Sequence, residues 1–133
     1  MRTSGILMPV SSLPSAHGIG TFGAAARDFV DFLQKAGQRR WQLLPVGPTG
    51  YGDSPYQSFS AFAFNPYFID LDRLCDEGLL TQEEIAAADM GSDIHRTDYG
   101  KLFDNRIPLL KKAASRFEKT QAYSDFEDEN ASW

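Results

Sequence analysis

The chain has 133 residues, of which 42% are hydrophobic and 23% charged, values typical of one soluble globular domain. The formal net charge is −5 and the basic residues are not gathered in any segment, which argues against nucleic acid as a partner. A single cysteine excludes an intrachain disulfide, and two histidines give no zinc-binding spacing. No stretch has the length of a membrane span or the apolar core of a signal peptide. We therefore expect a cytoplasmic protein that binds neither metal nor membrane.

Two apolar runs flank an amphipathic helix in the first part of the chain. Gly5–Val10 and Trp41–Val46 have the length and composition of strands that are covered on both faces. Between them, helical spacing of apolar residues predicts a helix over Ala24–Ala36, and Gly37 is placed to end it. Strand, helix and strand make a βαβ unit, for which we expect a right-handed, parallel arrangement. The apolar face of the predicted helix consists of Ala25, Phe29, Phe32, Leu33 and Ala36.

Two loops leave the predicted strands at their carboxyl ends, where ligands gather in parallel sheets. The first loop, Ser11–Gly20, has the Ser, Pro and Gly content of a loop and contains His17, which we interpret as an ordinary polar residue. The second loop, Gly47–Tyr67, is long for a compact domain, and connections of that kind are usually functional. Its glycines and prolines bend the backbone at defined places.

A short strand and a capped helix are predicted after the second loop. Phe68–Leu71 has a strand-like alternation, in which Asp70 and Asp72 are expected to face solvent. The stretch Leu80–Ala88 begins with a capping box and a hydrophobic staple, both of which are helix-start signals. The two pairs are Thr81 with Glu84, and Leu80 with Ile85.

Two further helices are predicted in the last third of the chain. Asp98 is placed to cap a long helix, and Pro108 is expected to bend that helix or to separate its start from its end. A second capping box, Ser124 with Glu127, predicts a helix that has barely begun at Trp133, and we interpret the chain as part of a longer protein. The apolar face of the long helix is predicted to be Phe103, Ile107, Leu110, Ala114 and Phe117.

Four side chains of the second loop suit a sugar ligand. A carboxylate and a hydroxyl can hydrogen-bond sugar hydroxyls, and tyrosine rings can pack against the apolar face of a pyranose. The alternative is that the carboxylate accepts a hydrogen bond within its own turn and that the tyrosines belong to the core. The four residues are Tyr51, Asp53, Ser54 and Tyr56.

Two other chemistries fit the second loop poorly. Its glycines lack the Gly-Lys-Ser/Thr ending of a phosphate-binding loop and no helix pattern follows, which weakens a nucleotide-binding interpretation. A retaining glycosidase mechanism needs two carboxyl groups about 5 Å apart. Asp53, Asp70 and Asp72, the only nearby candidates, give no convincing catalytic pair.

Several sequence motifs are shared with a known family. They are Ser11-Ser-Leu-Pro-Ser, Gly18-Ile-Gly-Thr-Phe-Gly23, Trp41-Gln-Leu-Leu-Pro, Gly47–Phe62 and Asn65-Pro-Tyr, with weaker support from Asp98-Tyr-Gly and Phe126–Trp133. On these motifs the chain resembles the 4-α-glucanotransferases of glycoside hydrolase family 77, also called amylomaltases or disproportionating enzymes. The resemblance is strongest over residues 4–72. It implies an α/β fold: the N-terminal part of a (β/α)8 (TIM) barrel with a helical insertion, incomplete on its own.

The resemblance also implies a reaction. A segment of an α-1,4-glucan is transferred to the 4-hydroxyl of an acceptor glucose or glucan, with retention of configuration through a covalent intermediate. The implied partners are maltooligosaccharides or starch-like α-glucans, and no metal or organic cofactor is implied. The Asp nucleophile, the Glu acid/base and a supporting Asp of the family come from later barrel strands, so this chain alone is expected to be inactive.

Four residues of this chain match the glucan-contacting motif of the family: Tyr51, Asp53, Ser54 and Tyr56. Residues 1–72 are expected to form the first βαβ portion of the barrel, with residues 47–67 as the substrate loop, and residues 73–133 a mostly helical insertion truncated at its C-terminus. Phe64 departs from the pattern, because the family usually has Gly there; its side chain could alter the path of the loop or fill space beside the sugar. A stand-alone α-glucan-binding module without catalysis is the rival interpretation.

Overall fold

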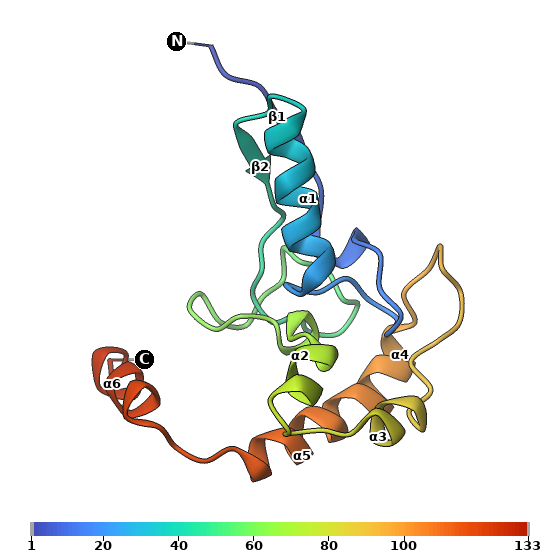
Figure 1. The fold of residues 1–133 in the computed structure, drawn as a ribbon, viewed down its shortest axis with the longest axis vertical. Helices are drawn as coiled ribbons and strands as arrows, with labels where there is room; N and C mark the ends of the chain where they lie inside the picture. The colour runs from blue at the N-terminus through green and yellow to red at the C-terminus, as the bar shows by residue number, and fades with distance from the viewer. Residues whose placement is uncertain (1, 133) are drawn as a thin grey trace.

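The computed structural model describes residues 2–132 and has an α/β fold with a two-stranded parallel sheet (Figure 1). Strands β1 (Gly5–Leu7) and β2 (Arg40–Gln42) pair in register with Ile6 opposite Trp41. The predicted parallel pairing across a helix is therefore confirmed, although both strands are shorter than the apolar runs that predicted them. The sheet and its helix form one end of the molecule, the short helices form the other, and the two loops lie between them.

The two strands are less covered than their composition predicts. Leu7 is 54% exposed, and within residues 2–132 the sheet has no third strand. The Trp41 ring packs against the helix, with 5.0 Å between its centroid and that of the Phe29 ring. Its Nε1 donates to the carbonyl of Met8, the residue after β1, at 2.8 Å. The expectation of strands covered on both faces is wrong for the described chain, because one helix covers only one side of the sheet.

Helix α1 (Ala24–Lys35) closely matches the predicted range and ends before Gly37. Leu33 and Ala26 are buried and Phe29 packs partly against the same cluster, as an amphipathic helix requires. The predicted face is wrong at Phe32, which is exposed and stacks on Phe29 with 6.1 Å between ring centroids. The small sheet does not extend far enough to cover that ring.

The remaining helices are η1 (Val10–Ser12), η2 (Pro66–Phe68), α2 (Leu71–Asp76), α3 (Gln82–Ala86), α4 (Tyr99–Lys101), η3 (Leu102–Arg106), α5 (Ile107–Arg116) and α6 (Gln121–Glu129). η1 contributes to the smaller of two hydrophobic clusters and α6 has no buried residue, whereas the others contribute to the larger cluster. The cluster joins Ile19 of the first loop and Tyr67 of the second to residues from α2, α3, η3 and α5. Both loops are thus attached to one core. Within residues 2–132, no helix combines the length and the apolar character that a membrane crossing needs.

The predicted strand Phe68–Leu71 is wrong. η2 ends at Phe68, and Asp70 is the N-cap of α2, where its carboxylate accepts a hydrogen bond from the Arg73 amide at 3.0 Å. The same carboxylate accepts from the Thr21 hydroxyl, so Asp70 is not a free solvent-facing residue. An aspartate that can satisfy the open amides of a helix start outweighs a short alternation of apolar residues.

The two predicted helix starts in the middle of the chain are confirmed. In the capping box of α3, the Thr81 hydroxyl accepts from the Glu84 amide at 3.3 Å and the Glu84 carboxylate accepts from the Thr81 amide at 3.0 Å. Leu80 and Ile85, the predicted staple, are both buried in the larger cluster. Asp98 caps α4 by accepting from the Lys101 amide at 3.1 Å.

Helical backbone runs without a gap from Tyr99 to Arg116, so Pro108 does not split the helix; a bend at Pro108 stays a prediction. A π-helical turn, η3, precedes α5, and Pro108 occupies the first turn of α5, where no intrahelical amide donor is needed. The predicted apolar face is wrong by one position, since Phe103 is exposed. The face that is buried instead consists of Leu102, Arg106, Leu109 and Ala113.

The predicted capping box of Ser124 with Glu127 is also wrong. Helix α6 begins four residues earlier with Thr120 as its N-cap, and Ser124 lies within the helix, donating to the Thr120 carbonyl at 3.4 Å. Glu127 pairs with Lys119 at 2.8 Å. The helix has nine residues and ends at Glu129, so it does not support the idea of a helix that has barely begun. The error arose because Thr120 offers an equivalent cap one turn upstream.

Candidate functional site

The second loop is a closed excursion with internal turns. The Asn65 amide donates to the Val46 carbonyl at 2.8 Å, and Thr49 and Ser58 form an isolated antiparallel bridge, so the two ends of the loop are held together. At its tip the Asp53 amide donates to the Gly50 carbonyl at 3.1 Å. Hydrogen-bonded turns of this kind present side chains at defined places without a regular element.

The two predicted tyrosines lie on the surface of this loop. Tyr51 is 105% exposed and Tyr56 is 73% exposed, so neither belongs to the core of the described chain. The Ser54 hydroxyl accepts a hydrogen bond from the Tyr56 amide at 3.3 Å, so the side chain of Ser54 stabilises the turn. Exposed rings above a hydrogen-bonded turn can contact a ligand without prior movement of the core.

Asp53, at the tip of the loop, is half-buried. It is a non-glycine residue with φ 54°, a left-handed conformation that aspartate tolerates better than most residues. Within residues 2–132 no hydrogen bond to its carboxylate is present, so the expected local Asx bond is not formed. Its carboxylate is therefore available to an incoming hydroxyl group.

The charge of Asp53 acts on two phenols. Burial raises the pKa of Tyr67, and the Asp53 and Tyr99 charges raise it further; burial and Asp53 likewise raise the pKa of Tyr99. The two rings are tilted against each other with 6.0 Å between centroids. Both phenols therefore keep their protons at neutral pH and can donate hydrogen bonds.

An aromatic groove of about 540 Å³ follows the second half of the loop. Tyr56 lines it together with three exposed phenylalanines, Phe59, Phe62 and Phe64. Phe64 is 67% exposed, but its ring meets the edge of Phe22 at 6.2 Å, and Phe22 in turn meets Phe68 at 6.0 Å. Phe64 thus stands at the wall of the groove and does not enter the core.

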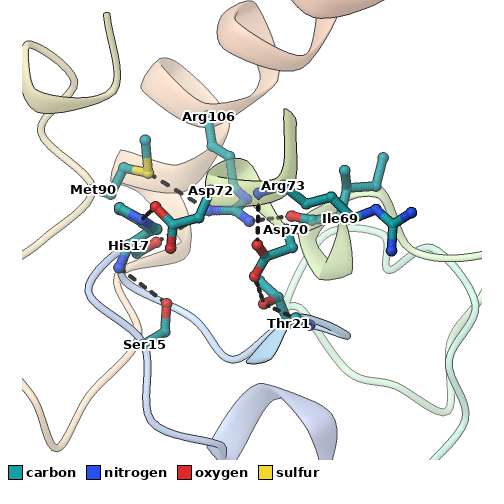
Figure 2. Close-up of polar contacts among 10 residues, drawn as sticks. Ser15, His17, Thr21, Ile69, Asp70, Asp72, Arg73, Met90 and Arg106 are labelled. Atoms are coloured by element: carbon teal, nitrogen blue, oxygen red, sulfur yellow. Dashed lines mark hydrogen bonds and ion pairs between the residues drawn. The ribbon is translucent and has the colours of Figure 1, made fainter. Parts of the chain in front are cut away.

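A polar network centred on Arg106, which the sequence did not predict, lies between η3, the first loop and the start of α2 (Figure 2). This arginine is 0% exposed, and its guanidinium donates from Nη2 to the Ile69 carbonyl at 2.6 Å and from Nη1 to the His17 carbonyl at 3.2 Å. A third contact joins Nη1 to the Met90 sulfur at 3.6 Å. Burial lowers the pKa of Arg106 to about 10, so the group is still charged at neutral pH. The only signal in the sequence was its helical spacing from Leu102.

His17 is more than an ordinary polar loop residue. Its side chain is 16% exposed and its Nε2 lies 3.0 Å from Oδ1 of Asp72, at the start of α2. Its amide donates to the Ser15 hydroxyl at 3.0 Å. His17 therefore fastens the first loop to α2, while its carbonyl accepts from Arg106 in the same network.

The chemistry available at these loops is recognition. Asp70 is engaged in a helix cap and Asp72 in a hydrogen bond with His17, which leaves Asp53 as the carboxylate of this region that is open to a ligand. No group of three or more His, Cys, Asp or Glu that could hold a metal ion occurs within residues 2–132. The loops present aromatic surface, hydroxyls and one carboxylate, a set that suits a neutral, polyhydroxylated ligand.

Comparisons with known proteins agree on one family. The family model described as 4-alpha-glucanotransferase matches residues 8–133. The 4-alpha-glucanotransferase of Streptococcus pneumoniae is 55% identical over 135 residues, covering 99% of this chain and 27% of that protein. That of Thermus thermophilus is 47% identical over 138 residues, with the same coverage of 99% and 27%.

A solved structure gives the same result for the fold. The amylomaltase from Streptococcus agalactiae in complex with acarbose superimposes with a TM-score of 0.91 and 45% identity, over 98% of this chain and 27% of that one. The chain thus spans about a quarter of the length of the relatives that it matches.

Proposed function

The chain belongs to the 4-alpha-glucanotransferase family, and we propose that it supplies the glucan-holding loop of such an enzyme. The reaction is the transfer of an α-1,4-glucan segment to the 4-hydroxyl of an acceptor glucose or glucan. The observation that carries this proposal is the exposed second loop, in which two aromatic rings and an uncommitted carboxylate occupy the positions of the family motif.

Each residue of the loop has a part in holding the glucan. Tyr51 and Tyr56 offer ring faces to the apolar faces of glucose units, and Asp53 accepts hydrogen bonds from sugar hydroxyls. Ser54 shapes the turn that places Tyr56. The related amylomaltase was solved with acarbose, an observation that supports maltooligosaccharides or starch-like α-glucans as the ligand class here.

Bond cleavage is assigned to residues outside this sequence. A retaining transfer needs a nucleophile and an acid/base carboxyl about 5 Å apart, and the carboxylates near the loop are otherwise engaged or single. We therefore expect the isolated chain to lack transferase activity. The parent enzyme needs no metal or organic cofactor for such chemistry, because carboxylates carry it out.

The architecture that accompanies this function is the N-terminal part of a (β/α)8 barrel. We assign residues 1–72 to its first βαβ portion and residues 73–133 to a mostly helical insertion. The parallel pairing of β1 with β2 across α1 supports the first assignment, and the short helices α2 to α6 support the second. A cytoplasmic location remains part of the proposal.

Two measurements on the isolated chain test the proposal. Titration calorimetry with maltoheptaose should detect binding that Tyr56→Ala weakens, and incubation with maltotriose should release no glucose. Release of glucose and longer glucans would contradict the assignment of catalysis to other segments. Absence of binding by a folded chain would contradict the role of the second loop.

The alternative is a stand-alone α-glucan-binding module that uses the same loop. The exposed aromatic groove favours it as the second candidate, since a groove can bind without a catalytic pair. A longer reading frame that adds paired Asp and Glu residues, together with transferase activity of the longer protein, would decide against the module.

A further inference from the structure

We propose that Arg106 is the positioning residue of the glucan-holding site, joining the first loop to the end of η2, the turn in which the second loop ends, through two backbone carbonyls. The inference rests on the proposed function for the identity of the ligand, but the attachment of the loops can be tested without any ligand. Arg106 itself is fully buried, so it acts through the residues that it holds.

The two short contacts of Arg106 lead to the two loops. Nη2 donates to the carbonyl of Ile69 at 2.6 Å, directly after the η2 turn that ends the second loop. Nη1 donates to the carbonyl of His17 in the first loop at 3.2 Å. One planar group therefore sets the distance between two segments that are 52 positions apart in the sequence (69 minus 17).

The contact to Ile69 is transmitted to the ligand-facing side of the second loop. Tyr67 lies two residues before Ile69 in the same turn, and Asn65, the N-cap of η2, donates its amide to the Val46 carbonyl at 2.8 Å, which closes the second loop. The Phe22 amide also donates to the Phe68 carbonyl at 3.0 Å, so the segment after the first loop is joined to η2. A shift of η2 would displace the acceptor that we assign to the sugar.

The hydrogen-bond partners of Arg106 are unusual for an arginine that only stabilises the fold. Both Nη atoms donate to backbone carbonyls and to sulfur, and no salt bridge to this arginine is present within residues 2–132. Its Nε atom is buried without a hydrogen-bond partner in the same part of the chain. Burying a charge in this way is costly, and a well-packed apolar residue of similar length is often neutral or stabilising.

The π-helical turn explains how an arginine reaches this place. Arg106 is the last residue of η3, immediately before α5, and Pro108 cannot supply the amide that a continuous α-helix would use there. The wider turn directs residue 106 toward the loops, while Leu102 and Leu109 keep the same face in the core. Single π turns are frequent at functional sites, and this one aims a cation at two loop carbonyls.

The test compares three variants of the 133-residue chain. Arg106→Met keeps a long apolar side chain and removes both carbonyl contacts. Arg106→Lys keeps the charge, but its single ammonium group lacks the fork that spans two carbonyls. Arg116→Met is the matched control, because Arg116 also donates to a backbone carbonyl, that of Leu79 at 3.0 Å, but lies at the far end of α5.

Three quantities are measured for each variant: the thermal midpoint, amide hydrogen exchange and the affinity for maltoheptaose. In Arg106→Met we expect a midpoint close to that of the parent chain and exchange of the Gly20, Phe22 and Ile69 amides faster by about tenfold. Maltoheptaose affinity should fall by about tenfold in the same variant and by less in Arg106→Lys. Arg116→Met should leave those amides and the affinity unchanged.

Other outcomes overturn the proposal. Unchanged exchange in the loops of Arg106→Met would show that Arg106 does not hold them. Faster exchange throughout the chain with a large drop in the thermal midpoint would assign Arg106 a purely structural role. If Arg106→Met does not fold, the same criteria are applied to Arg106→Lys. Failure of both variants to fold would also assign Arg106 a purely structural role. If the parent chain binds no maltoheptaose, the proposed function fails while the exchange pattern still decides the attachment of the loops.

Discussion

The second loop and the network below it differ in almost every physical property. Tyr51 at the loop is 105% exposed, whereas Arg106 in the network is 0% exposed. The loop is recognisable from its motif, but its hydrogen bonds are mostly local turns. The network is inconspicuous in the sequence and joins segments that are far apart.

This difference separates two requirements of a binding site. A ligand needs groups that are exposed and unsatisfied, and such groups contribute little to the stability of the fold. The geometry of those groups has to be set by residues whose side chains contact distant parts of the chain. In this chain the first requirement is met by the second loop and the second by Arg106, His17 and Asp70. Substitutions in the two regions should therefore have different consequences.

The largest effect is expected from a pair of glycines that share a backbone conformation but differ in surroundings. Gly18 has φ 78° and an added Cβ would lie 2.1 Å from the Met90 carbonyl oxygen, whereas Gly52 has φ 91° and nothing within 4 Å. We expect Gly18→Ala to reduce the free energy of unfolding by about 3 kcal/mol or more and Gly52→Ala by about 1 kcal/mol. Urea denaturation of both variants measures the difference, and equal losses would show that the two loops are equally packed.

The next largest effect is expected at Tyr56, on the exposed second loop. Tyr56→Ala should weaken maltoheptaose binding by about tenfold, because a stacking surface is removed, and should leave the thermal midpoint unchanged. Tyr56→Phe keeps the ring and is the control, with affinity close to that of the parent chain. Calorimetric titration measures both variants. A drop in the midpoint of Tyr56→Ala would show that this ring supports the fold.

A pH dependence is expected at the surface ion pair that joins α3 to α5, away from the second loop. Hydrogen bonds from Arg116 and Lys112 hold the pKa of Glu84 well below its usual value of 4.5. The folded chain therefore binds this proton less readily than the unfolded chain, so the contribution is present above about pH 4.5 and is lost as the pH falls toward the folded pKa. Glu84→Gln keeps the capping box and removes the charge.

The thermal midpoint of Glu84→Gln should depend less on pH than that of the parent chain between about pH 5 and pH 2. The contribution is modest because the ion pair is at the surface and is screened by water and salt. Identical pH profiles for the two chains would show that the ion pair is not formed in solution. The affinity for maltoheptaose at neutral pH should be the same in both.

The smallest effect is expected at Phe64. Its ring is largely exposed and touches Phe22 only at an edge, so Phe64→Ala should change stability little and should lower maltoheptaose affinity by about threefold. Tighter binding by the variant would indicate that the ring fills space needed by the sugar. A large loss of stability would place Phe64 with the buried region.

Local signals in the sequence predicted local features well. The range of α1, the capping box of Thr81 with Glu84 and the cap at Asp98 were confirmed because each depends on residues within one or two helical turns. The same kind of signal failed where two neighbouring caps compete, as for Thr120 and Ser124, or where an aspartate in an apolar stretch begins a helix, as for Asp70.

The core face of η3 and α5 shows the limit of reasoning by hydrophobic spacing. Apolar residues alone favoured the face with Phe103, but the face with Arg106 is the buried one. An arginine is expected at the surface unless partners for its guanidinium are known, and these partners are carbonyls 37 and 89 positions away. No local pattern contains that information.

The sequence by itself determined the family, the parallel pairing of two strands across a helix and the loop whose residues we assign to the glucan. Motifs and periodicity are properties of short stretches, and short stretches were enough for those conclusions. Only the tertiary structure decided that Tyr51 and Tyr56 are exposed and that Arg106 joins the first loop to the end of η2. Burial and long-range hydrogen bonds depend on which segments meet in space, and that meeting occurs only in the folded chain.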